Sequence, residues 1–205
     1  MKRDLFFAIE QHLMSDENPS EYLETLLENP ALQETPFDML FQLKRIRQSP
    51  KYHPEGNVWI HTMMVTDWAA RVKEQSSDKT VFLWAALLHD IGKGRTTRIR
   101  KGKITSYDHD KVGKEMAKEF FSHFEVSPIF VEKVAALVRW HMQILYVVKD
   151  LRFADIQSME EQTDIREVAL LGLCDRMGRL GTDLKKEEEN IRIFLQKCGR
   201  QMRDG

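Results

Sequence analysis

Six ionisable side chains lie among apolar residues in segments that are far apart along the chain. They are His61 in "NVWIHTMMV", His89 and Asp90 at the end of "WAALLHD", His109 in "SYDHDKVG", His141 in "ALVRWHM" and Asp175 in "LLGLCDRMG". Buried polar groups need partners, and one shared cation would satisfy all six at once. Imidazole and carboxylate together suit iron, manganese, nickel, cobalt or zinc. The pattern therefore predicts a site for one or two divalent transition metals.

Each of these residues also has an ordinary explanation when it is taken singly. A histidine such as His61 or His141 can be a hydrogen-bonded core residue, and Asp175 can pair with Arg176 or Arg179. The His-Asp dipeptide by itself carries little information, because a second copy occurs at His109-Asp110. Separate partners for each of these polar groups would all have to be buried in one small core, whereas one ion can serve as the partner of all of them. The shared-metal interpretation is therefore favoured.

The elements that must position these side chains are helices. Apolar residues recur at helical spacing in segments near 5–13, 20–27, 37–46, 57–70, 81–88, 109–123, 127–141, 164–179 and 184–201. Segment 142–163 reads as a loop with a short helix. In "TTRIRKGKITSYD", Lys101-Gly102 separates two runs with β-branched residues, which predicts a β-hairpin. The fold class expected is all-α, a helical bundle with one small hairpin.

Segment 81–88 is apolar around its whole circumference, which predicts a helix in the centre of the bundle. His89 and Asp90 then lie at the inner end of that helix, where an unpaired charge would be costly. Gly92 and Gly94 follow, and they allow the helix to stop and a backbone to approach a ligand.

Composition limits the classes of protein that the chain can belong to. The 205 residues suit one large domain, and 42% apolar with 31% charged residues is typical of a globular protein with a real core. A net charge of −1 predicts no broad field for nucleic acid or membranes. The two cysteines, Cys174 and Cys198, suit a reducing compartment. We find no signal peptide and no membrane span, so we expect a cytoplasmic protein.

The ordered set His61, His89-Asp90 and Asp175 resembles the defining motif of the HD-domain superfamily of metal-dependent phosphohydrolases. "HDIGK" is its commonest local spelling, and His109 and His141 match the extra histidines of two-metal members. The stretches "SPKYHPEGNVWIHTMMVTDWAA", "LLHDIGKG", "SYDHDKVGKEMA" and "LCDRMGR" are most similar to the HD domain of bacterial CCA-adding tRNA nucleotidyltransferases. The resemblance implies a helical lead-in over 1–50, packed on an HD domain over 51–205. Nothing in the chain matches the nucleotidyltransferase half of those enzymes.

The resemblance implies two metals that share one carboxylate. One would take His61, His89, Asp90 and Asp175, and the other would take Asp90, His109 and His141. A water between the ions would attack phosphorus, which makes Asp90 and Lys93 the predicted catalytic residues. Predicted phosphate ligands are Lys93, Arg95, Arg98 and Arg139. Arg176 is disfavoured, because neighbours on a helix point about 100° apart.

Three functions remain open at the level of sequence. The first is a phosphohydrolase for nucleotide or RNA-end phosphates, with a possible local RNA contact, no membrane contact and no predicted oligomeric state. The second is an HD-fold mixed-valent di-iron oxygenase, which uses the same six ligands. The third is a non-catalytic module that binds tRNA or nucleotides around a structural metal.

Overall fold

A computed structural model describes residues 2–204 of the chain. Met1 and Gly205 lie outside the described residues. They are the first residue of the predicted lead-in over 1–50 and the last residue of the predicted HD domain over 51–205. The long helices are α1 (Lys2–Ser15), α4 (Val58–Val72), α5 (Lys79–Leu88), α7 (His109–Phe121), α8 (Pro128–Trp140), α11 (Ile165–Met177) and α12 (Leu184–Asp204). The short ones are α2 (Pro19–Thr25), α3 (Asp38–Phe41), α6 (Lys93–Thr96), α9 (Gln143–Val148) and α10 (Ile156–Glu160). The strands are β1 (Arg98–Arg100) and β2 (Lys103–Thr105).

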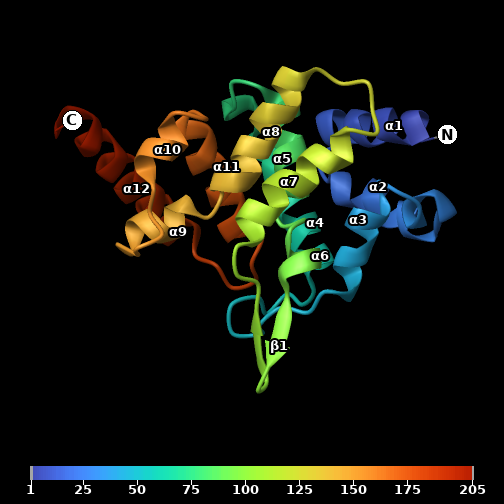
Figure 1. The fold of residues 1–205 in the computed structure, drawn as a ribbon, viewed down its shortest axis with the longest axis horizontal. Coiled ribbons are helices and arrows are strands. Elements are labelled where there is room, and N and C mark those ends of the chain that lie inside the picture. The colour runs from blue at the N-terminus through green and yellow to red at the C-terminus, as the bar shows by residue number, and fades with distance from the viewer. Residues whose placement is uncertain (1, 205) are drawn as a thin grey trace.

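Helix α5 is the centre of the bundle (Figure 1). It contacts α1, α4, α8 and α11, and α7 packs against α8 and places Phe120 and Phe121 against Trp84 of α5. All eight residues from 81 to 88 are at most 4% exposed. Asp78 caps this helix by accepting a hydrogen bond from the backbone N–H of Val81. The predicted burial of this segment is therefore confirmed.

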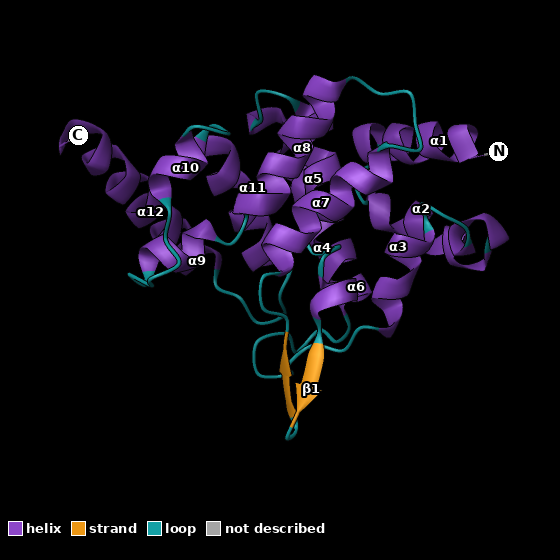
Figure 2. Cartoon of the chain, in the orientation of Figure 1, coloured by secondary structure: helices purple, strands orange, loops and turns teal. Residues whose placement is uncertain are grey.

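The hairpin extends away from the helical body, as Figure 2 shows. Its register pairs Arg98 with Thr105, Ile99 with Ile104 and Arg100 with Lys103. Lys101 and Gly102 make the turn with positive φ values of 49° and 74°, as a two-residue hairpin loop requires. Helices are the other regular elements in the described residues. The predicted all-α HD bundle with one small hairpin is therefore confirmed.

The amino-terminal helices pack directly on the central helix. The Phe6 ring stacks on Trp84 with ring centroids 4.8 Å apart, and the Trp84 indole N–H donates to Glu10 over 2.9 Å. Asp67 on α4 accepts hydrogen bonds from the backbone N–H and the hydroxyl of Ser20. A division of the chain at residue 50 stays a prediction.

Three segments differ in detail from the sequence prediction. The expected helix over 37–46 is α3 followed by a 3-10 turn over Gln42–Arg45. Segment 142–163 holds two short helices, α9 and α10. The glycine-rich stretch after Asp90 forms the short helix α6 before the hairpin begins.

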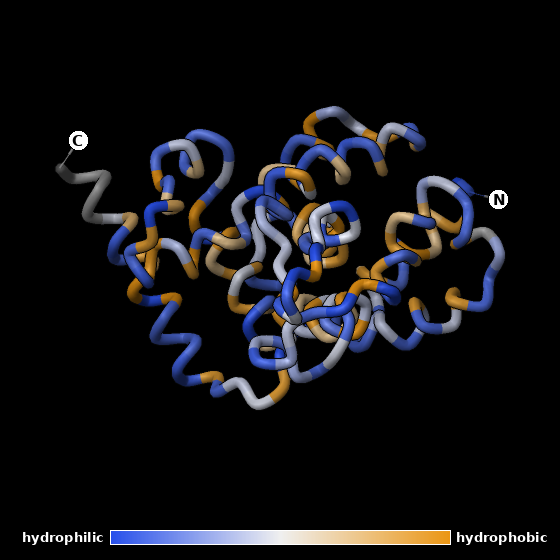
Figure 3. The backbone as a smooth tube through the Cα atoms, turned by 60° about the horizontal axis from the view of Figure 1, so that its bottom comes forward, coloured by the Kyte–Doolittle hydropathy of each residue, from blue (hydrophilic) through white to orange (hydrophobic). Residues whose placement is uncertain are grey.

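Hydropathy along the chain follows this arrangement (Figure 3). Helix α12 is mostly hydrophilic along its length, with short apolar stretches that include the buried residues Phe194 and Cys198. Among the described residues, none of the helices combines the length and the apolar character that a membrane crossing requires.

Candidate metal centre

The six predicted ligands are brought together where the central helices end. His61 lies on α4, His89 and Asp90 directly follow α5, His109 begins α7, His141 directly follows α8 and Asp175 lies on α11. All six are between 0 and 7% exposed. The helices cross at this point, so residues distant in the chain face one another across a few ångströms.

The two carboxylate oxygens of Asp90 face two different histidine pairs. Oδ2 lies 3.7 Å from Nε2 of His61 and 3.4 Å from Nε2 of His89. Oδ1 lies 3.5 Å from Nε2 of His109 and 3.9 Å from Nε2 of His141. Each pair with Asp90 forms a group of donor atoms close enough to hold one ion. The carboxylate therefore stands between two donor sets, as a bridging ligand would.

Hydrogen bonds fix the orientation of the histidine rings. The Nδ1 atoms of His89, His109 and His141 contact the carbonyl oxygens of Ala86, Ser106 and Val138 over 2.8, 2.8 and 2.7 Å, each three residues earlier in the chain. A carbonyl only accepts, so Nδ1 carries the proton and a neutral ring presents the lone pair of Nε2. All three lone pairs point toward Asp90. This is the form in which imidazole binds metals.

The chemistry of these donors fits a cation. Nε2 of His109 and Nε2 of His141 are 3.3 Å apart. Burial lowers the pKa of His109, and burial together with the neighbouring histidines lowers the pKa of His141 to about 4. Both rings are therefore neutral near pH 7, and neither Nε2 has a proton to donate to the other. A positive ion satisfies both lone pairs.

The second donor set is also completed by a carboxylate. Nε2 of His61 lies 3.4 Å from Nε2 of His89 and 3.0 Å from Oδ1 of Asp175. Burial acts to lower the pKa of His61, but Asp175 and Glu55 outweigh it, so that this pKa is raised. Burial also opposes ionisation of Asp175, yet the Arg179 guanidinium and His61 hold its pKa well below the usual range.

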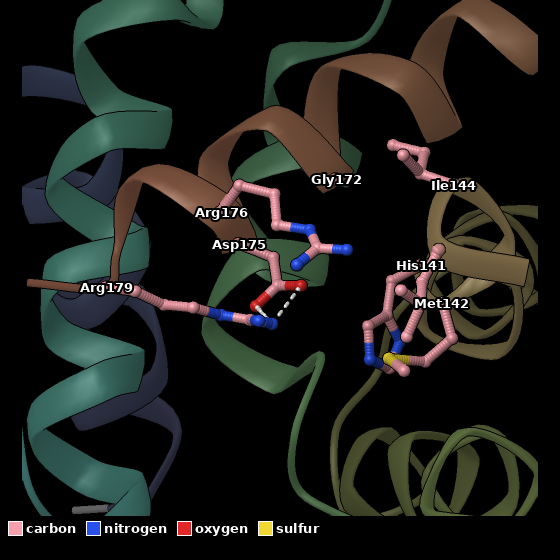
Figure 4. Close-up of a pocket in the computed structure, with 8 residues that line it drawn as sticks. His141, Met142, Ile144, Gly172, Asp175, Arg176 and Arg179 are labelled. Carbon is pink, nitrogen blue, oxygen red and sulfur yellow. Dashed lines mark hydrogen bonds and ion pairs between the residues drawn. The ribbon is translucent and has the colours of Figure 1, made fainter. Parts of the chain in front are cut away.

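Two arginines flank Asp175, Arg176 on α11 and Arg179 just after the end of that helix, as Figure 4 shows. Arg179 donates to both oxygens of Asp175 over 2.9 Å. Arg176 extends its guanidinium into the space between Asp175 and His141. Arg176 lines the cavity although it is next to Asp175 on the helix, because its side chain is long, and a phosphate role for it stays untested.

Lys93 reaches the same site from α6. Its ammonium lies 2.6 Å from Oδ2 of Asp90 and donates to Oε1 of Gln48 over 2.7 Å. Burial opposes ionisation of Asp90, but Lys93 and the neighbouring histidines hold the pKa of this carboxyl well below its usual value. Lys93 is 8% exposed and therefore forms part of the inner wall.

The other three predicted phosphate ligands lie outside the cavity lining. Arg95 makes an exposed ion pair with Glu119 over 2.9 Å. Arg98 donates to backbone carbonyl oxygens within its own turn. Arg139 pairs with the buried Asp110, and its guanidinium lies 4.1 Å from the centroid of the Trp140 ring. A phosphate role for these three arginines stays a prediction that their partners do not favour.

Sequence reasoning missed three polar residues of the site, Glu55, His53 and Gln48, whereas Arg179 was named as a possible partner of Asp175. Glu55 is 9% exposed, and its Oε1 lies 3.0 Å from Nδ1 of His61 and 2.8 Å from Nδ1 of His53. Gln48 and Arg179 hold Lys93 and Asp175 in place, as described above. Glu55 and His53 belong to the turn-rich stretch "KYHPEGN", and its closeness to His61 in sequence was the one available signal.

An open cavity of about 370 Å³ leads from solvent to these groups. Its inner wall includes Asp90, Lys93, His109, His141, Asp175, Arg176 and Arg179. Gln48 lies beside Lys93, and the mouth is formed by Ser49, Tyr52, His53, Ile104, Thr105, Ser106, Met142 and Leu145. Two kinds of group therefore meet here, a cluster of metal-type donors and a set of cations that suit a phosphate.

This fold and donor set define a helical domain built around a candidate metal site. A family model described as "HD domain" matches residues 58–179, and the chain belongs to the HD-domain family. The matched range includes all six residues of the donor cluster.

The chain is also similar to longer curated proteins. The "Multifunctional CCA protein" of Actinobacillus pleuropneumoniae serotype 5b (strain L20) is 32% identical over 181 residues, which cover 83% of this chain and 42% of that protein. The protein of the same name from Pasteurella multocida (strain Pm70) is 31% identical over 172 residues, 80% of this chain and 40% of that protein. The one from Hahella chejuensis (strain KCTC 2396) is 28% identical over 196 residues, which cover 90% of this chain and 44% of that protein. The chain thus spans less than half the length of these relatives.

Proposed function

We propose that this protein is a divalent-metal-dependent phosphohydrolase that acts on nucleotide or RNA-end phosphates in the cytoplasm. The single observation that supports this most is the position of Asp90. One carboxylate faces two histidine pairs and a lysine, and two arginines line the same cavity. Donors for metal and cations for phosphate share one opening.

The proposed ligands are His61, His89, Asp90 and Asp175 for one ion, and Asp90, His109 and His141 for a second. Bound there, divalent manganese, nickel, cobalt, iron or zinc would supply Lewis acidity and a water of lowered pKa. The chain's own residues orient and neutralise the substrate. Lys93 and Arg176 present fixed positive charge to the non-bridging phosphate oxygens, where charge develops during hydrolysis. Arg179 holds Asp175 in place.

The substrate class rests on the cavity and on the relatives. An opening of about 370 Å³ has room for a nucleotide-sized group. The relatives are named for CCA, and the resemblance to the HD domain of CCA-adding enzymes favours 2′,3′-cyclic phosphodiesters and 2′- or 3′-phosphomonoesters. The di-iron oxygenase and the non-catalytic module are the alternatives that the test must separate.

The test is a metal-by-substrate screen on the purified chain. Mn²⁺, Ni²⁺, Co²⁺, Zn²⁺, Fe²⁺ and Mg²⁺ are each combined with cyclic nucleotides, mononucleotides and short RNAs that end in phosphate. We expect phosphate release or ring opening with at least one transition metal. Asp90→Asn should abolish it, and Asp67→Asn on α4 is the matched control. Oxygen consumption with iron and no phosphate chemistry would support the oxygenase, and silence throughout would overturn the proposal.

A further inference from the structure

The β-hairpin carries an excess of positive charge that the catalytic proposal does not use. Between Ile91 and Tyr107 the chain has six basic residues and no acidic one, although its overall net charge is −1. Lys93 and Arg95 pair with Asp90 and Glu119. Arg100, Lys101 and Lys103 are exposed and have no acidic partner among residues 2–204.

The register gives this hairpin two different faces. Side chains alternate along a strand, so Arg98, Arg100 and Lys103 project from one face and Ile99 and Ile104 from the other. Arg100 stands directly opposite Lys103, and like charges in that position destabilise a strand pair. A short two-stranded hairpin is itself marginal. Folding therefore gives no reason for this arrangement, whereas a polyanionic ligand does.

The position of the hairpin connects these cations to the cavity. Ile104, Thr105 and Ser106 form part of the cavity mouth. Thr105 pairs with Arg98 and therefore lies on the cationic face, whereas Ile104 lies on the other face, so the cationic face begins at the cavity mouth. From there the hairpin projects away from the helical body (Figure 1). The hairpin cations would therefore contact the part of a polymeric ligand that lies outside the cavity, and not the phosphate bound inside it.

Two exposed aromatic rings lie at the base of the hairpin. Tyr107 follows β2 and is 78% exposed, and Tyr52 in the cavity mouth is 60% exposed. Lys51 lies 5.3 Å from the centroid of the Tyr52 ring. Cations that follow a backbone, combined with rings on which bases stack, are the usual elements of single-strand binding. A flat anionic membrane would use neither the spacing along the hairpin nor rings set back at its base.

We propose that the hairpin is a docking arm for single-stranded nucleic acid. Arg100, Lys101 and Lys103 contact the sugar-phosphate backbone, and Tyr107 and Tyr52 stack on bases near the end that enters the cavity. This inference rests on the proposed function for the fate of that end. The docking itself needs no turnover.

The test measures fluorescence anisotropy of a labelled single-stranded RNA of about twelve nucleotides with the full chain as purified. The hairpin variant is Arg100→Gln/Lys101→Gln/Lys103→Gln. The control variant removes equal charge on other elements, Lys149→Gln/Lys185→Gln/Lys186→Gln. We expect about tenfold weaker binding for the hairpin variant only. The slope of log K against log salt concentration, measured between roughly 50 and 200 mM salt, should also fall in magnitude by about 2 for that variant.

A second variant tests the stacking contact. Tyr107→Ala should weaken binding about tenfold without changing the salt dependence, because a stacked base releases no counterions. Single-stranded DNA of the same sequence shows what the arm recognises. Equal binding of DNA and RNA indicates contacts to the phosphate backbone that both share, and weaker binding of DNA indicates a contact to the 2′-hydroxyl of RNA. Both results support the proposal.

The proposal is overturned if the hairpin variant matches the wild type in affinity and salt dependence. It is also overturned if the wild type binds neither RNA nor DNA, or binds only phosphatidylcholine vesicles with about a third phosphatidylserine. Gel analysis of the probe after each titration verifies that it is intact. The outcome is therefore independent of the hydrolysis screen, and either proposal can fail alone.

Discussion

Glu55 and Asp175 contact the two nitrogens of one buried imidazole, that of His61. Oε1 of Glu55 lies 3.0 Å from Nδ1, and Oδ1 of Asp175 lies 3.0 Å from Nε2. The carbonyl oxygen of Gly178 also lies 3.2 Å from Nδ1, so Glu55 and Gly178 together favour a proton on this nitrogen, while Asp175 stands on the side of the proposed metal. This relationship makes a residue of a turn-rich loop part of the site.

Replacing the charge behind His61 should weaken metal binding. Glu55→Gln removes the carboxylate that holds Nδ1, and partners of this kind contribute about 10- to 100-fold to metal affinity. Isothermal titration with Mn²⁺ measures the loss. Glu119→Gln, on a surface carboxylate paired with Arg95, is the control and should titrate like the wild type. Equal affinity in both variants would show that Glu55 has no positioning role.

The close approach of α6 to α7 makes Gly92 sensitive to any side chain. A Cβ at this position would lie 2.0 Å from the carbonyl oxygen of His109 and 2.6 Å from the backbone N–H nitrogen of Gly113. Both neighbours are backbone, so Gly92→Ala must displace the start of α7 and with it the His109 ring. Gly94→Ala meets nothing within 4 Å and is the matched control.

We expect Gly92→Ala to lose the ion held by His109 and His141 while the fold is retained. Metal analysis after desalting, with circular dichroism alongside, provides the measurement. Full metal content in Gly92→Ala would contradict the assignment of His109.

Substitutions of Arg176 on α11 and of Arg179 just after it should have different effects. Arg176 contacts no carboxylate of the donor cluster, so Arg176→Gln should leave metal affinity unchanged and lower kcat/KM by about 10- to 100-fold. Arg179 donates to both oxygens of Asp175, so Arg179→Gln should weaken metal binding as well. Titration and steady-state kinetics on the active substrate separate the two effects. Identical behaviour of the variants would refute the division of roles.

Metal removal should lower stability, because the donors form a compact cluster only in the folded chain. An ion present at about 100 times its Kd adds about 2.7 kcal/mol to the free energy of unfolding. Thermal melts with and without a chelator should therefore differ for the wild type. Asp90→Asn should show no such difference, since it lacks the shared carboxylate. A chelator effect of the same size in that variant would place the stabilising ion elsewhere.

Five of the six candidate donors could be found from the sequence because they interrupt or end an apolar helical pattern, whereas His109 stands in the polar stretch "SYDHDKVG". His61 and His141 stand where periodicity requires a buried position, and burial of a polar group indicates a partner. The central helix over 81–88 was predicted on the same ground. These are local signals, read from neighbours within one or two turns.

The cations could not be predicted in this way. Arg95, Arg98 and Arg139 lie close in sequence to Asp90 or His141, yet each finds a nearer partner once the chain is folded. Arg176 and Arg179 reach the cavity because α11 crosses α4 and α8, and this crossing is set by packing, not by sequence spacing. Glu55 and Gln48 lie in loops, where no periodicity shows which way a side chain points.

The contact between His61 and Asp175 joins residues 114 positions apart in the chain. Closing so long a loop has an entropic cost, which the contact must offset. A nascent chain that has not yet completed α11 therefore lacks one side of the cluster. The candidate metal site is therefore complete only when helices from both halves of the chain have packed together.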